Sequence, residues 1–249
     1  MEHDGTTLGD AIQERKRVFK ELSPKEKVGY IFDYYKIPII GGILLAILIG
    51  FFLYHYIFEN QDTLVYGMFV NISADEMTSQ DVPADYMTYS NHSTRDYRAY
   101  FEGNLFMGVD LGVEAESDYS TVMKIASTIA AKQLDFLICD DYVFENYEKV
   151  AGYADLSELL PADLFEQMES EGRIVYGQGT EENAGRTDEY AMAIDITDTD
   201  FAAQYHMKPL SGDTIYLTFI VNSKKPDECV NVLRYIFGQD YVAAAAAAE

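Results

Sequence analysis

The chain has 249 residues, with 18 Lys and Arg against 42 Asp and Glu, so its formal net charge is −24 at pH 7. An acidic surface of this kind repels nucleic acid, and we expect no nucleic-acid partner. It attracts cations or a basic partner, although the simpler interpretation is that the charge keeps the chain soluble.

Residues 1–36 carry seven basic and seven acidic residues and predict a cytoplasmic head. Residues 7–22 have a loose helical periodicity that indicates a weak amphipathic helix. The sequence Ser23-Pro24-Lys25-Glu26 then predicts a helix start, because serine and glutamate can form a capping box around a proline at the first helical position. This second helix suits an interfacial entry to a membrane, and a plain cytoplasmic helix is the alternative. We expect a kink or break at Pro38.

Residues 37–58 contain no Asp, Glu, Lys or Arg and are long enough to cross the hydrocarbon core of a bilayer, which is roughly 30 Å thick. They predict one transmembrane helix. A buried core helix is less favoured, because the 36 preceding residues could hardly wrap it. A cleaved signal peptide is also less favoured, because its apolar run is normally roughly 7–15 residues and no small-x-small cleavage site follows here.

The distribution of Lys and Arg predicts the orientation of the span. Seven basic residues precede it, and none follows until Arg95. The positive-inside rule therefore places the N-terminus in the cytoplasm and residues 59–249 outside the cell membrane. The part after the span holds 11 basic and 35 acidic residues, so the whole net charge belongs to it.

Residues 59–249 predict alternating strands and helices. We expect a first strand at 64–72, then a loop with at most one short helix, and a second strand at 105–113 with alternating apolar residues. Further strands are expected at 134–139, 173–178, 189–195 and 213–223, with helices at 118–133, 142–152, 162–171, 198–205 and 225–238. This order predicts an α/β domain with a mixed or mostly parallel sheet flanked by helices.

The two cysteines, Cys139 and Cys229, both follow the predicted span. Outside the cell they are able to form a disulfide. The alternative is two buried free thiols, because both lie in partly apolar surroundings.

Three stretches of the sequence resemble the extracellular solute-binding proteins of bacterial ABC importers, which have the type 2 periplasmic-binding fold. They are residues 125–161, residues 189–200 and residues 214–238. The resemblance implies a reduced version of that fold, because the 191 residues after the span are few for two full lobes. It also implies a binding role for a small solute, or a role as a tethered accessory subunit of a membrane transporter.

Asp140, Asp141 and Tyr142 are the best candidates for a ligand site, because they directly follow the predicted strand 134–139. Ligands of open α/β sheets bind beyond the carboxyl ends of strands. Carboxylates there can hold an amine or a cation, and tyrosine can provide a stacking wall. The favoured alternative is that one aspartate caps the next helix.

Asp195, Asp198 and Asp200 form a second acidic group that can offer oxygen atoms to Ca²⁺. Their spacing does not follow an EF-hand loop, and no glycine lies among them. Capping of the helix that begins near Phe201 is the favoured alternative.

The sequence contains no nucleophile elbow, P-loop, dinucleotide fingerprint or H-E-x-x-H motif. We therefore expect no enzyme activity and no cofactor. The sequence predicts a single-pass, membrane-tethered extracellular binding or accessory protein, with the lipid bilayer, a membrane transporter, a small solute or Ca²⁺ as partners. The alternative is a structural or assembly subunit of a membrane complex that binds no small molecule.

Overall fold

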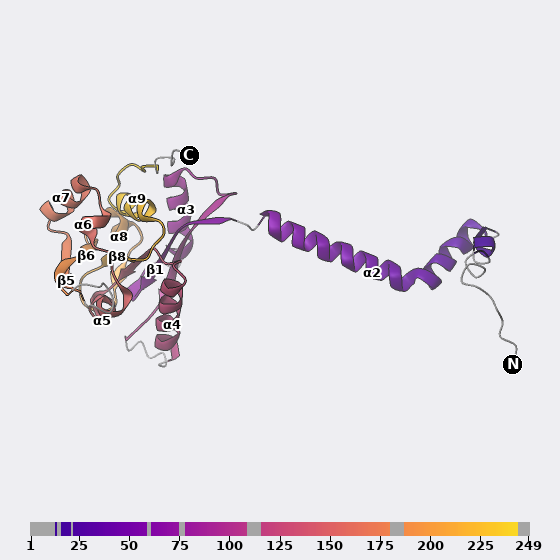
Figure 1. Cartoon of the computed structure of the whole chain (residues 1–249), viewed down its shortest axis with the longest axis horizontal. Coiled ribbons are helices and arrows are strands. Elements are labelled where there is room, and N and C mark those ends of the chain that lie inside the picture. Colours follow the sequence, from indigo (N-terminus) through magenta and orange to yellow (C-terminus); the bar gives the residue numbers. More distant parts are fainter. Residues whose placement is uncertain are drawn as a thin grey trace. The chain divides into compact units, whose positions relative to one another are not determined.

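The computed structural model describes residues 13, 16–20, 22–58, 61–74, 78–108, 116–179 and 187–243. Its contacts divide the chain into two compact units, residues 1–60 and residues 61–249 (Figure 1). The helices are α2 (Pro24–Phe58), α3 (Thr78–Ser90), α4 (Glu116–Ala130), α5 (Asp141–Ala151), α6 (Leu156–Leu159), α7 (Ala162–Ser170), α8 (Asp200–Gln204) and α9 (Pro226–Ile236). The strands are β1 (Asp62–Val70), β2 (Ile72–Ser73), β3 (Tyr97–Leu105), β4 (Phe136–Cys139), β5 (Ile174–Gln178), β6 (Glu189–Asp195), β7 (Lys208–Pro209) and β8 (Tyr216–Phe219).

The predicted capping box begins α2. The backbone N–H of Ser23 donates to Glu26 Oε2 at 3.0 Å, and the N–H of Glu26 donates to Ser23 Oγ at 3.4 Å. The helix then continues to Phe58, so no break occurs at Pro38, and the alternative of a kink there stays a prediction. A proline inside a helix removes one backbone hydrogen bond, and the neighbouring turns keep their own hydrogen bonds, so the helix continues.

Residues 37–54 of α2 are long and apolar enough to cross a membrane, with a mean hydropathy of 2.5, and none of these residues is buried. Length and composition alone support this statement. Of the expected amphipathic helix at 7–22, residues 16–20 are helical, and most of the remainder lies outside the described residues.

Six strands form the main sheet, in the order β3-β1-β4-β8-β6-β5. β1 pairs in parallel with both β3 and β4, whereas β8 is antiparallel to β4 and β6, and β5 is antiparallel to β6. The predicted α/β class is therefore confirmed, and the sheet is mixed. The short strands β2 and β7 form a separate antiparallel pair.

The side chains of β4 alternate between two cores on opposite faces of the sheet. Phe136 and Ile138 belong to a core that includes residues of α3, α6, α7, α8 and α9. Leu137 and Cys139 belong to a second core with residues of α4 and α5. In Figure 1, α3 and α9 lie above the strands and α4 and α5 lie below them. Complete burial on both faces explains why this strand is a continuous apolar run.

Three predicted elements differ from the structure. The second strand, predicted at 105–113, is instead β3, which ends at Leu105; residues 106–108 are not a strand, and residues 109–113 lie outside the described residues. The predicted loop with a short helix contains the 13-residue helix α3. The long strand predicted at 213–223 is only the four-residue β8.

The carboxylate of Asp135 fixes the amino-terminal end of β4. It is almost completely buried, accepts the backbone N–H of Tyr66 at 2.8 Å and the hydroxyl of Ser223 at 2.6 Å, and lies 3.7 Å from Lys225 Nζ. Burial raises the pKa of Asp135, and the hydrogen bonds and Lys225 oppose that rise. This side chain joins β1, β4 and the loop after β8.

Gly67 of β1 lies directly against the ring of Phe136, and a Cβ atom there would lie 2.0 Å from the ring. We predict that Gly67→Ala lowers the free energy of unfolding by about 1–3 kcal/mol, because the ring is enclosed and cannot move away. Urea unfolding of the full-length chain in detergent, followed by the near-ultraviolet signal of its tyrosines, measures this. In a chain that already carries Phe136→Leu, the same Gly67→Ala change should cost less unfolding free energy. An equal cost of Gly67→Ala in both backgrounds would contradict the steric explanation.

The raised pKa of Asp135 predicts a pH dependence. Its contribution to stability is complete below the ordinary aspartate pKa of about 4 and is lost as pH rises through the higher folded value. Asp135→Asn can still accept from Tyr66 and donate to Ser223, but it does not ionise. The variant should therefore lose less unfolding free energy than the native chain between about pH 4 and pH 7. Parallel stability curves in urea titrations across this range would contradict the prediction.

Candidate functional site

Asn71 and Asp140 meet at the carboxyl ends of β1 and β4. Asn71 is fully buried and has a left-handed backbone with φ of 57°, which asparagine tolerates better than most residues. Its side-chain amide donates to Met107 O at 2.7 Å and to Asp140 Oδ1 at 3.3 Å, and the N–H of Met107 donates to Asn71 Oδ1 at 2.8 Å. One amide thus connects the ends of three neighbouring strands.

Asp140 is the N-cap of α5, so the capping alternative is confirmed for this residue. Its carboxylate accepts the backbone N–H of Val143 at 3.0 Å and that of Ser211 at 2.9 Å. The side chain is fully buried, and burial raises its pKa.

Asp141 holds the loop that leads into β8. It accepts the backbone N–H of Asp213 at 2.9 Å and the hydroxyl of Tyr216 at 2.6 Å. The pKa of Tyr216 is raised to about 12, mainly by burial and to a smaller extent by the hydrogen bond to Asp141. Gly212 approaches so closely that a Cβ atom would lie 1.5 Å from the Asp141 carboxylate, and its φ of 72° also favours glycine.

Tyr142 packs against Gly108, where a Cβ atom would lie 2.0 Å from the tyrosine ring. The three predicted ligand residues therefore lie at the edge of the sheet where ligands of α/β proteins bind, but the chain's own loops contact them there. Their role in ligand binding stays a prediction.

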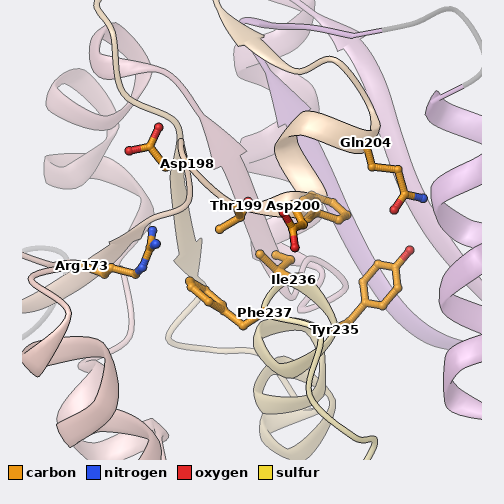
Figure 2. Close-up of a pocket in the computed structure, with 10 residues that line it drawn as sticks. Arg173, Asp198, Thr199, Asp200, Gln204, Tyr235, Ile236 and Phe237 are labelled. Carbon is orange, nitrogen blue, oxygen red and sulfur yellow. The ribbon is translucent and has the colours of Figure 1, made fainter.

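A pocket of about 320 Å³ lies between the start of β5, the start of α8 and the end of α9 (Figure 2). Figure 2 shows Arg173 on one side of it, Gln204 and Tyr235 on the opposite side, and Ile236 and Phe237 below. The complete lining consists of Arg173, Asp198, Thr199, Asp200, Phe201, Gln204, Tyr235, Ile236, Phe237 and Gly238. Two of the three predicted metal ligands, Asp198 and Asp200, therefore belong to a pocket.

Arg173 is held in a fixed position at this pocket. Its guanidinium lies 5.1 Å from the centroid of the Phe237 ring, a cation–π distance. Nη1 donates to the carbonyl oxygen of Asp195 at 3.2 Å, and Nε donates to Glu171 at 3.1 Å. The side chain thus brings positive charge to the pocket without large conformational freedom.

Asp198 and Asp200 are exposed and bring negative charge to the same pocket. Among the described residues, Arg173 forms its ion pair with Glu171 and not with Asp198 or Asp200 of the pocket. Thr199 caps α8 by accepting the N–H of Ala202 at 3.2 Å. The expectation that an aspartate caps this helix is wrong, because the hydroxyl of Thr199 occupies the cap position.

Tyr235 is positioned by a chain of hydroxyl groups. The hydroxyls of Tyr235 and Tyr205 lie 3.0 Å apart, and the Tyr205 hydroxyl donates to Asp85 Oδ2 at 2.6 Å. Burial raises the pKa of Tyr235, so its hydroxyl stays protonated near neutral pH. The pocket therefore offers a guanidinium, two carboxylates, an amide and a phenol around apolar side chains.

Asp195 does not line this pocket. Its Oδ1 accepts the N–H of Thr197 at 2.9 Å and the Thr197 hydroxyl at 2.6 Å, which closes the turn after β6. No group of three or more His, Cys, Asp or Glu able to hold a metal ion occurs in the part of the chain that the structure describes. The predicted Ca²⁺ site thus stays a prediction, and the carboxylate of Asp195 stabilises the turn after β6.

Both cysteines are free thiols. Cys139 and Cys229 are buried, and burial is the main reason why the pKa of each thiol is raised. The disulfide alternative is therefore not found, and both residues pack in the cores.

A comparison of the chain with protein-family models, with curated proteins and with solved structures gives no match. Function must therefore be argued from the site itself.

Sequence reasoning missed Arg173 and Tyr235 as site residues, because each belongs to an ordinary amphipathic element. The pocket combines segments that are 25 to 65 residues apart in the chain, measured from Arg173 to Asp198 and to Gly238. The available signal was the pair Asp198 and Asp200, two acidic side chains in a short loop before a helix.

We predict that Asp141→Ala lowers the free energy of unfolding by about 1–3 kcal/mol, because it leaves backbone N–H groups and the Tyr216 hydroxyl without their acceptor. Asp213→Ala is the matched control, because it removes a neighbouring carboxylate but keeps the N–H that Asp141 accepts. Urea unfolding of the two full-length variants in detergent compares them. Equal losses would show that Asp141 does not hold this loop.

Proposed function

We propose that the chain is a membrane-tethered binding protein. In this proposal, residues 37–58 span the cell membrane, the N-terminus is cytoplasmic and residues 59–249 are extracellular. Support comes from the length and hydropathy of α2 and from the seven basic residues that precede its apolar part. The domain after the span then binds a solute or another membrane component, such as a transporter.

The observation that carries the binding proposal is the presence of both positive and negative side chains in the lining of the pocket of Figure 2. Arg173 and Asp198 lie on the same side of it and Asp200 lies nearer its middle, but the ion pair of Arg173 among the described residues is with Glu171. The pocket has a volume of about 320 Å³, which is at the lower limit for small-molecule pockets, roughly 300–1,000 Å³. A small solute would fit its size.

The chemistry of the lining suggests the kind of solute. Asp198 and Asp200 suit an ammonium group or Ca²⁺, and the Arg173 guanidinium suits a carboxylate or another anionic group. Ile236 and Phe237 can cover an apolar part of the ligand. A small molecule that carries an ammonium group, an anionic group and an apolar part would match this lining.

The resemblance to extracellular solute-binding proteins is part of this proposal. Its three stretches form the end of α4 through α6, β6 with the start of α8, and β8 with α9. Their strands β4, β8 and β6 are neighbours in the sheet, which is compatible with one reduced lobe. A transporter accessory role follows from the resemblance, not from the fold.

The second candidate is a structural or assembly subunit that binds no small molecule. The contacts of Asp140 and Asp141 favour it, because the loop around Ser211 and Asp213 takes the hydrogen-bonding capacity of the carboxylates at the usual ligand position. A closed site of this kind stabilises the domain without any solute.

Thermal unfolding of the full-length chain in detergent distinguishes the two candidates. We predict that one class in a panel of amino acids, sugars, short peptides and Ca²⁺ raises the unfolding temperature in a saturable way, because it binds only the folded state.

The double variant Asp198→Asn with Asp200→Asn should lose this rise. Asp163→Asn, which changes an exposed aspartate on α7 outside the pocket, should retain it. No rise across the whole panel would contradict the solute proposal and favour the assembly subunit.

A further inference from the structure

A groove of about 1110 Å³ extends from the amino-terminal ends of β1 and β4 to the edge strand β3. Lys132 and Gln133 before β4, Lys224 and Lys225 after β8, and Asp62 and Thr63 at the start of β1 are among its lining residues. Tyr66 and Tyr100 also line it, with ring centroids 5.7 Å apart. We name it the lysine groove.

The lysine groove concentrates positive charge in an acidic domain. Only 11 basic residues follow Phe58 in the sequence, against 35 acidic ones. Three of the 11 line the groove, and two more contact its lining: Arg98 lies 4.1 Å from the centroid of the Tyr100 ring, and Lys124 pairs with Glu102. Nearly half of the basic residues therefore surround this one groove.

Two of these lysines are available for an anionic ligand. Lys225 donates to Thr63 O and lies near Asp135, and Glu102 is occupied by Lys124 and by the hydroxyl of Tyr66. Lys132 and Lys224 are exposed and have no ion pair within the described part of the chain. Asp62 is the other carboxylate of the lining, so the groove stays positive overall.

The position of the groove in the sequence limits its distance from the end of α2. Asp62 follows Phe58, the last residue of α2, by four residue steps. An extended chain covers at most about 3.6 Å per step, so this connection spans no more than about 14 Å. The headgroup layer on each side of a bilayer is roughly 5–8 Å thick. If α2 spans the membrane, lipid headgroups lie within reach of the groove.

We propose that the lysine groove binds the phosphate group of an anionic phospholipid. The inference rests on the membrane anchoring proposed above. Lys132 and Lys224 supply the positive charge, and the tyrosine rings suit the interface between lipid and water. The acidic surface elsewhere is repelled by the same lipids, so this contact determines which side of the domain faces the bilayer.

The reactivity of individual lysines tests the proposal. The full-length chain is placed in nanodiscs of phosphatidylcholine, or of an equimolar mixture with phosphatidylglycerol, and treated with an amine-reactive reagent whose sites are measured by mass spectrometry. Modification of Lys132 and Lys224 should slow by about fivefold in the anionic nanodiscs, the change expected for one lysine near an anionic surface. Lys208, an exposed lysine outside the groove, is the internal control.

Two variants sharpen the test. If both lysines hold one phosphate, Lys132→Gln should reduce the protection of Lys224 in anionic nanodiscs, and Lys208→Gln should not. Equal slowing at Lys208, or no slowing at Lys132 and Lys224, would overturn the proposal.

A third arm separates the possible sources of phosphate. If millimolar inorganic phosphate protects the two lysines equally well in neutral nanodiscs, the ligand is a soluble anion and the lipid proposal fails. A chain that does not enter the nanodiscs contradicts the anchoring itself, and with it the lipid contact. A chain that enters but keeps reactive lysines contradicts the groove alone.

Discussion

Two buried carboxylates hold the ends of β4, an interior strand of the sheet. Asp135 joins its amino-terminal end to β1 and to the loop after β8, and Asp140 joins its carboxyl end to α5 and to the loop before β8. A buried carboxylate is stable only where hydrogen bonds replace its water, so both loops must keep their positions. The loop after β8 lines the lysine groove with Lys224 and Lys225, and it leads into α9, whose end lines the pocket.

The sequence predicted the elements whose local signals agree with their burial. Phe136 to Cys139 is apolar on both faces, and the capping box of Ser23 and Glu26 marks the start of α2. Helix α3 was underestimated because it is polar and contains Pro83, yet Tyr86 is fully buried and packs against Phe101 of β3. Such a helix depends on tertiary packing, which a local pattern does not contain.

The candidate site was predictable only in part. Asp198 and Asp200 were recognisable as an acidic pair, but Arg173, which lines the same pocket, comes from the start of β5 and joins them only when the chain is folded. At Asp140 the sequence indicated both a ligand role and a cap, since an aspartate after a buried strand fits either. The N–H groups of Val143 and Ser211 show that the cap is present, and the second donor comes from a loop 71 residues away.

In the proposed topology, one membrane span presents the α/β domain outside the cell, and the side of each end of the chain tests it most directly. Single cysteines at Val18 and Val242, both exposed, can be labelled on intact cells with a membrane-impermeant maleimide; the native Cys139 and Cys229 are buried and give little background. If this topology is correct, the cysteine at position 242 reacts on intact cells and the cysteine at position 18 reacts only after lysis. The reverse pattern, or equal reaction of both before lysis, would contradict it.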